Sequence, residues 1–208
     1  MSFFENTRKP VGIGGKVMVS MMNFGHRALA DWGFRFLNIP ADATVLDCGC
    51  GGGANVKRLL EKCHDGVVKG IDYSAVSVEK ARKVNRKAVE SGRADIICAS
   101  VADIPFEDEK FDLITAFETV YFWQELTKSF REIYRVLKRG GEFFICNECN
   151  GDSEKDNKWT EVIDGMRIYN DVQLKSVLEQ VGFCDVRVQK NKKGWICVKA
   201  RKQEDLER

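Results

Sequence analysis

The segment VLDCGCGGG, residues 45–53, places a carboxylate and four glycines directly after an apolar run. Glycine adopts positive φ without strain and lets another group approach the main chain closely. One glycine would suit a turn, but four glycines indicate a loop on which a ligand lies. Such a loop can bind either the phosphates of a dinucleotide or a ligand that carries positive charge.

Asp47 favours the positively charged ligand. The letters GCGGGA, residues 49–54, also fit the dinucleotide pattern G-x-G-x-x-G/A, which carries little weight when it occurs alone. A carboxylate beside the loop would repel a diphosphate by about 3 kcal/mol at about 5 Å and an effective dielectric of about 20. The same carboxylate attracts a cation, so a ligand with an ammonium and a sulfonium suits the loop better. The alternative is that Asp47 is a structural acid at a strand end.

Two further acids suit the binding of a nucleoside. Asp72, in GIDYS, follows the loop by roughly 20 residues, where an acid can bind both ribose hydroxyls. Asp103, in SVADIPFEDEKFDLI, could accept a hydrogen bond from the exocyclic amine of a base, while Ala102 presents its backbone to the ring. Either acid could instead cap a helix or a turn.

His26 and Glu118 are the candidates for proton transfer. His26 is one of only two histidines and follows Gly25 at an expected helix break. It could lie over the ligand as a lid residue or general base, because imidazole titrates near neutral pH, or it could be a hydrogen-bonded core histidine. Glu118 lies at the end of an expected strand and could orient an acceptor proton or form only local hydrogen bonds.

Aromatic residues are candidates for the wall of an acceptor site. Tyr121 lies in FETVYFWQE, residues 117–125, together with Trp123, for which packing inside the next helix is the expected role. Trp159 and Tyr169 belong to a segment that could cover the site. Their aromatic character favours a moderately apolar acceptor.

The cysteines do not predict a metal site. Cys146 and Cys149, in CNEC, have the spacing of half a zinc site, but no second pair at suitable spacing follows. We therefore expect buried thiols and no metal. Clustered thiols also leave open a less favoured alternative, arsenite methylation, which would use soft sulfur ligands. Eight cysteines in 208 residues are typical of reduced thiols in a cytoplasmic protein.

Short β-rich segments and helical segments alternate from about residue 44. This alternation predicts a parallel sheet covered by helices on both faces. The expected strands are TVLDC, VVKGIDY, ADIICAS, FDLITAFE and GEFFICNE. The expected helices are ANVKRLLEKC, AVSVEKARKVNRKAVESG and WQELTKSFREIYRVLKRG, the last of them ending in a basic turn and Gly140.

The two ends of the chain differ from this rhythm. NDVQLKSVLEQVGF predicts a helix capped by Asn170 or Asp171 and ended by Gly182, and an antiparallel hairpin follows it. Residues 15–38 predict a helical segment kinked near Gly25. Its methionines, Met18, Met21 and Met22, predict a lid over residues 10–30 that is mobile without ligand.

Four motifs occur in order and carry a resemblance to a known family. VLDCGCGGG, GIDYS, VADIPFEDEKFDLI and EIYRVLKRGGEFFI are similar to the motifs of class I S-adenosylmethionine-dependent methyltransferases, over about residues 40–200. The resemblance implies an α/β, Rossmann-like sheet of seven strands with the last strand antiparallel, helices on both faces and a helical cap. The expected divisions are a cap or lid at 1–40, the cofactor-binding domain at 41–201 and a frayed tail at 202–208.

The resemblance also implies a cofactor and its binding residues. S-adenosylmethionine would bind and leave as S-adenosylhomocysteine. Asp47, Gly49, Cys50 and Gly51 would surround the methionine part, and Asp72 would bind the ribose. The residues expected at the adenine are Tyr73, Ala102 and Asp103.

The composition narrows the expected partners. A net charge of +2 does not indicate the basic surface that binding of nucleic acid requires. No segment predicts a membrane span or a signal peptide. We expect a cytoplasmic monomer or homodimer that methylates a small-molecule acceptor. The alternatives are a non-catalytic cofactor-binding module of the same fold and an NAD-dependent oxidoreductase.

Overall fold

The computed structural model of the chain describes residues 26–204, apart from the side chains of 154, 155 and 157. The three methionines of the predicted lid therefore lie outside the described residues, as does most of the segment predicted to be a frayed tail. Among residues 26–204, no helix has the length and apolar character needed to cross a membrane.

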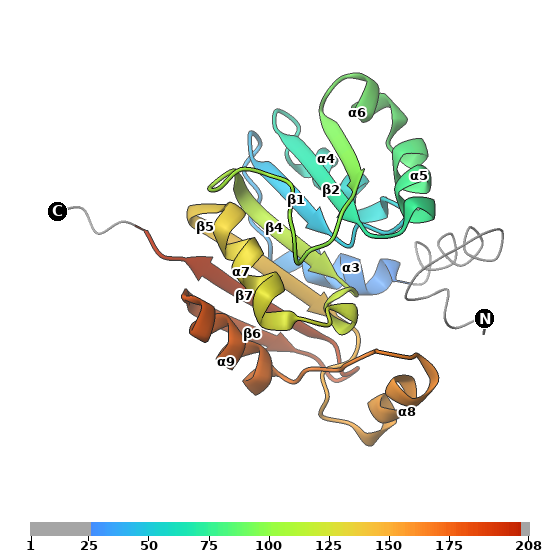
Figure 1. The fold of residues 1–208 in the computed structure, drawn as a ribbon, viewed down its shortest axis with the longest axis vertical. Helices are drawn as coiled ribbons and strands as arrows, with labels where there is room; N and C mark the ends of the chain where they lie inside the picture. The colour runs from blue at the N-terminus through green and yellow to red at the C-terminus, as the bar shows by residue number, and fades with distance from the viewer. Residues whose placement is uncertain (1–25, 205–208) are drawn as a thin grey trace.

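One sheet of seven strands forms the centre of the molecule, in the order β3-β2-β1-β4-β5-β7-β6 (Figure 1). The first five strands pair in parallel, and β7 runs antiparallel to both β5 and β6. The predicted mostly parallel sheet with a reversed last strand is thus confirmed. The strands are β1 (Thr44–Cys48), β2 (Val67–Asp72), β3 (Ala94–Cys98), β4 (Phe111–Phe117), β5 (Leu137–Asn147), β6 (Phe183–Lys190) and β7 (Ile196–Lys202).

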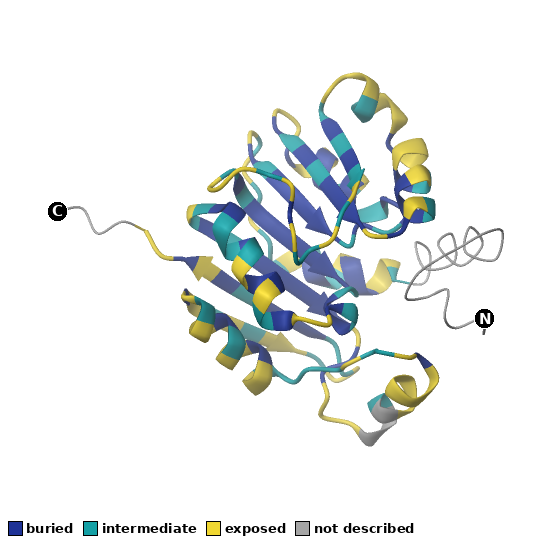
Figure 2. Cartoon of the chain, viewed as in Figure 1, coloured by how far each residue is buried: buried dark blue, intermediate teal, exposed yellow. Residues whose placement is uncertain are grey.

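Helices cover both faces of the sheet, as predicted. Buried side chains of α3, α4 and α5 form one apolar layer, and those of α7 and α9 form the other. Figure 2 shows the strands largely buried and the outer sides of the helices exposed. The helices are α3 (Arg27–Gly33), α4 (Ala54–Lys62), α5 (Ala75–Val84), α6 (Arg86–Glu90), α7 (Leu126–Val136), α8 (Glu154–Val162) and α9 (Asp171–Val181), with short 3-10 helices η1 (Phe34–Phe36) and η2 (Val120–Phe122).

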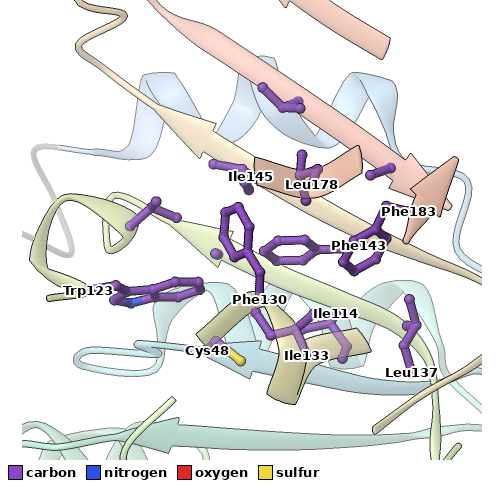
Figure 3. Packing of buried hydrophobic residues seen from close by; sticks show 14 of the residues in the cluster. Cys48, Ile114, Trp123, Phe130, Ile133, Leu137, Phe143, Ile145, Leu178 and Phe183 are labelled. Carbon is purple, nitrogen blue, oxygen red and sulfur yellow. The ribbon is translucent and has the colours of Figure 1, made fainter. Parts of the chain in front are cut away.

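Aromatic rings fill the layer between the sheet and helices α7 and α9. Phe130 of α7 meets Phe143 of β5 edge to face, with ring centroids 5.5 Å apart, and Trp123 stacks on Phe143 at 6.4 Å (Figure 3). Burial of each such side chain contributes roughly 1.5–3 kcal/mol. This layer fixes β4, β5 and the loop that follows β4 relative to one another.

The boundary between α7 and β5 differs from the predicted helix end at Gly140. The helix stops at Val136, and Leu137 already pairs with Phe111 as the first residue of β5. Leu137 is fully buried, and Lys138 forms an ion pair with Asp112 at 2.8 Å. The basic residues after α7 therefore bind acids of the β4 region instead of a helix terminus.

The predicted caps of the last helix are present. Asn170 accepts a hydrogen bond from the Gln173 N–H at 2.9 Å, and the Gln173 side chain accepts one from the Asn170 N–H, which completes a capping box. Gly182 ends α9 with φ 115°, a conformation that strongly favours glycine.

Candidate active site

Two glycines in the loop between β1 and α4 are required by packing inside the protein, independently of any ligand. A Cβ at Gly49, where φ is 72°, would lie 2.0 Å from the Thr119 Oγ1, and one at Gly53 would lie 2.6 Å from the Asn85 Nδ2. Neither position can accept a side chain without moving the protein itself. Gly51 is different, since φ is 52° but a Cβ there would meet nothing within 4 Å. Open space for a ligand therefore lies beside Gly51.

Asp72 ends β2 and is held by backbone N–H groups. One carboxylate oxygen accepts from the Gly51 N–H at 2.9 Å, and the other accepts from the Ser74 N–H at 2.8 Å. Burial raises the pKa of Asp72, and the two hydrogen bonds oppose that shift. An ionised carboxylate offers about four acceptor positions, so two remain for ligand hydroxyls.

A cleft of about 390 Å³ follows the carboxyl ends of β1 to β4. This volume lies within the range of about 300–1,000 Å³ that is typical of small-molecule sites. Four predicted cofactor residues line it: Gly49, Asp72, Tyr73 and Ala102. The remaining lining residues are Ile71, Ala99, Ser100, Val101, Thr119, Phe122, Trp123, Gln124, Glu125 and Ser129.

Three predicted cofactor residues do not line this cleft with their side chains. Asp47 is buried and accepts a hydrogen bond from the Thr115 hydroxyl at 2.7 Å, and burial raises the pKa of Asp47 to about 7. The Cys50 thiol faces the core, because a Cβ at Gly70 would lie 3.0 Å from its Sγ. Asp103 is exposed at a short bridge that follows β3.

Glu118 directly follows β4 and is held by groups that follow β5. Its own N–H donates to the Cys146 carbonyl at 2.9 Å, and its Oε1 accepts from the Glu148 N–H and from the Tyr121 hydroxyl, the latter at 3.2 Å. Only 11 % of its side-chain surface is exposed. Burial raises the pKa of Glu118 to about 8, against the effect of its hydrogen bonds.

His26 immediately precedes α3 and faces the same carboxyl group. Its Nε2 lies 3.8 Å from the Glu118 Oε2. Burial lowers the pKa of His26, and the charge of Glu148 opposes that shift. A neutral imidazole with a free nitrogen can accept a proton at neutral pH. The structure thus brings together the two residues predicted for proton transfer.

Tyr121 connects the ends of β4 and β5. Its side chain is buried, and its hydroxyl accepts from the Cys149 N–H at 2.7 Å while it contacts Glu118. Trp123 is buried in the core, as expected, although it precedes α7 instead of lying inside a helix. Its indole N–H donates to the Thr119 Oγ1 at 3.2 Å.

The cover segment extends beyond the carboxyl end of β5, where α8 lies apart from the sheet (Figure 1). Trp159 on α8 is 36 % exposed, and Tyr169 packs against the core layer that contains α7 and α9. Neither lines the cleft that contains Asp72.

Comparison with known proteins decides the family. Residues 46–145 match a family model described as a methyltransferase domain. The putative methyltransferase YrhH of Bacillus subtilis (strain 168) is 32 % identical over 120 residues, 57 % of this chain and 66 % of YrhH. The chain therefore contains a methyltransferase domain. The cofactor that such a domain in this fold implies is S-adenosylmethionine.

Other relatives of this methyltransferase are longer than the chain. Cycloartenol-C-24-methyltransferase 1 of Oryza sativa subsp. japonica is 29 % identical over 145 residues, which are 70 % of this chain and 41 % of that protein. The chain thus spans less than half of this relative. An S-adenosylmethionine-dependent methyltransferase from Aquifex aeolicus has the same fold, with a TM-score of 0.74, 21 % identity and coverage of 89 % of this chain and 97 % of that one.

The residues of the methyltransferase site fit this cofactor. Asp72 has acceptor positions left for ribose hydroxyls, the cleft has the volume of a small-molecule site, and space is open at Gly51. The eight cysteines are all free thiols. Cys146 and Cys149 are buried, as expected. Cys146 lies opposite Cys197 in the antiparallel pairing of β5 with β7, without a disulfide bond.

Sequence reasoning missed Thr119 and Glu148. Thr119 excludes a side chain at Gly49 and accepts from Trp123, while Glu148 supplies the N–H that holds Glu118. Their only sequence signal was their place at the end of an expected strand, Glu148 as the last residue of one strand and Thr119 directly after another. Such a place does not reveal which strand end will be the neighbour.

Proposed function

We propose that the chain transfers a methyl group from S-adenosylmethionine to a small-molecule acceptor. The observation that carries the proposal is the pairing of His26 with Glu118 beside the cleft that Asp72 lines. Glu118 precedes Thr119, a lining residue, so the cofactor cleft and the proton-transfer pair are adjacent. When bound, S-adenosylmethionine supplies a methyl group on a positively charged sulfur.

The cofactor side would bind through backbone groups and a few acids. Asp72 would accept hydrogen bonds from both ribose hydroxyls. Tyr73 and the backbone of Ala102 would both contact the adenine. Gly49, Cys50 and Gly51 would present backbone to the methionine part. The buried carboxyl of Asp47 would attract the cationic groups of the cofactor, and the exposed Asp103 would reach the adenine amine.

The acceptor side would position the nucleophile and exclude water. Most of the rate enhancement would come from near-attack geometry in a dry site. Glu118 would orient a proton of the acceptor, and His26 would remove it where the nucleophile must lose one. Tyr121 would act through its contact with Glu118. Trp159 and Tyr169 would contact the acceptor only if α8 closes towards the site.

The substrate class rests on composition and on the relatives. The net charge of the chain is only +2, and one relative is named as a 24-methylenesterol C-methyltransferase. We infer a small-molecule acceptor, no nucleic acid, a monomer or homodimer and a cytoplasmic location. The division into a cap at 1–40 and a domain at 41–201 remains part of this proposal, although Leu29 and Ala30 of α3 pack in the sheet's core layer.

Label transfer tests the proposal. The purified chain is incubated with S-adenosylmethionine carrying a tritiated methyl group and the small-molecule fraction of a cell extract. We expect label to enter a small molecule and S-adenosylhomocysteine to form in equal amount. Tight binding of S-adenosylhomocysteine with no label transferred to small-molecule fractions from several sources would favour the non-catalytic module.

A further inference from the structure

Two glutamates and a histidine from distant segments converge beside the cleft. The ligand atoms of His26, Glu118 and Glu148 all lie within 4.8 Å of one another. They come from the start of α3 and from the ends of β4 and β5. Within residues 26–204, no lysine or arginine forms an ion pair with either glutamate. The cluster therefore offers two carboxylates to a cation that the described part of the chain does not supply.

The spacing of these atoms distinguishes the possible cations. A divalent metal with tetrahedral ligands at about 2.1 Å holds them about 3.4 Å apart. An ammonium that donates tetrahedral hydrogen bonds of about 2.8 Å holds its acceptors about 4.6 Å apart. The His26 Nε2 and the Glu118 Oε2 are 3.8 Å apart, and no pair in the cluster exceeds 4.8 Å. The separation between His26 and Glu118 exceeds the metal spacing, and the upper limit of 4.8 Å accommodates the ammonium spacing.

We propose that His26, Glu118 and Glu148 bind the ammonium group of an amine acceptor, so that the methylated atom is nitrogen. The inference rests on the proposed methyl transfer and adds the substrate class. A neutral acceptor, such as an alcohol or a sterol, would bring no positive charge to the two acidic side chains. An anionic acceptor would be repelled by Glu148.

The reaction balances with the groups present. His26 Nε2 takes one proton from the bound ammonium, which frees the lone pair of the amine. That lone pair forms a bond to the methyl carbon, the carbon–sulfur bond breaks and its electron pair stays on sulfur. The products are a methylated ammonium and S-adenosylhomocysteine. The proton on His26 leaves to solvent, since 36 % of that side chain is exposed.

The inference links the charge state of Glu118 to amine binding. The groups that face it are His26 from α3, Tyr121 from η2, and Cys146, Glu148 and Cys149 from the end of β5. Its pKa is raised to about 8, so much of the free protein carries this carboxyl protonated at neutral pH. A bound ammonium favours the ionised carboxylate, so amine binding should release protons.

The same label-transfer reaction tests the proposal when its products are separated on a cation exchanger. We expect the labelled product to be retained below the pKa of an amine and released above it. Glu148→Gln should lower the rate at least tenfold, while Glu90→Gln, an exposed acid paired with Arg86 on α6, should leave it within twofold. Labelled product that is not retained at any pH would overturn the amine acceptor but not the methyl transfer. Absence of all transfer would overturn both.

A binding test separates the amine from a metal without any acceptor. The chain has only two histidines, so the ring signals of His26 can be followed by NMR, with the exposed His64 beside Asp65 as the reference. We expect methylammonium at millimolar concentration to shift the His26 signals in the wild-type protein but not in the Glu118→Gln, Glu148→Gln double variant. Equal shifts in both proteins, or micromolar Mn²⁺ that broadens His26 before His64, would contradict an ammonium site.

Discussion

The cofactor half and the acceptor half of the site hold their key carboxylates in different ways. Asp72 receives hydrogen bonds from two backbone N–H groups, one of which belongs to the residue two positions after it. Glu118 depends on Glu148 and Tyr121, which its own loop and a different strand end supply. The donors to Asp72 lie 2 and 21 residues away at one end of the β1–α4–β2 unit, whereas one donor to Glu118 lies 30 residues away and requires the pairing of β4 with β5. We expect changes in the two halves to have separable effects.

The largest effect should come from Glu118→Gln. The amide keeps the shape of the side chain but cannot carry the charge, so methyl transfer should slow by about 100-fold, the lower end of the usual effect of an acid–base group. Affinity for S-adenosylhomocysteine should stay within threefold, because Glu118 does not line the cleft that contains Asp72. Initial rates and calorimetry measure the two quantities. His26→Ala should likewise lower the rate of methyl transfer and retain the affinity for S-adenosylhomocysteine. If either variant lost as much cofactor affinity as rate, the effects of the two halves would not be separable.

Asp72→Asn should instead weaken the binding of S-adenosylhomocysteine. The amide nitrogen would face either the Gly51 or the Ser74 N–H, and the charged acceptor for the ribose is lost. Hydrogen bonds to charged groups contribute about 1.5–3 kcal/mol, so affinity for S-adenosylhomocysteine should fall at least tenfold. Thermal shift titration measures the change, with the exposed Asp103→Asn as the control expected to lose less. If Asp72→Asn bound S-adenosylhomocysteine with unchanged affinity, Asp72 would not be the residue that binds the ribose.

The stability of the ligand-free protein should fall as the pH rises. The pKa of Glu118 increases on folding from an ordinary value of 4.5 to about 8, so the folded state holds this proton more tightly than the unfolded chain. Its contribution is complete below about pH 4.5 and is lost as the pH passes about 8. Urea unfolding at pH 6 and pH 9 should differ by at least about 1.4 kcal/mol more in wild type than in Glu118→Gln. Equal differences would contradict the buried carboxyl.

Tyr121→Phe should have the smallest of these effects. Loss of the hydroxyl removes a hydrogen bond from Glu118 and leaves the Cys149 N–H without that acceptor. A typical hydrogen bond contributes about 1 kcal/mol, which corresponds to about a fivefold loss of turnover and a modest loss of stability. The pKa of Glu118 should rise further, which carboxyl NMR shifts can report. A variant with lower stability but an unchanged Glu118 titration would make Tyr121 purely structural.

The same contrast explains which features could be predicted from sequence. The glycine loop, Asp72 and the strand pattern are local, and the periodicity of apolar residues indicated the sheet before any contact was known. The end of α7 could not be predicted, because Lys138 binds Asp112 of a neighbouring strand instead of capping a helix. The partners of Glu118 were also hidden, since Glu148 lies 30 residues away and meets it only through the pairing of β4 with β5.

Calorimetry with S-adenosylhomocysteine and with NAD tests the central claim most directly, because it needs no acceptor. A cofactor cleft built around Asp72 and the loop at Gly51 predicts micromolar binding of S-adenosylhomocysteine. The buried carboxyl of Asp47 beside the loop predicts that NAD does not bind at the same concentrations. Micromolar binding of NAD without binding of S-adenosylhomocysteine would contradict the account.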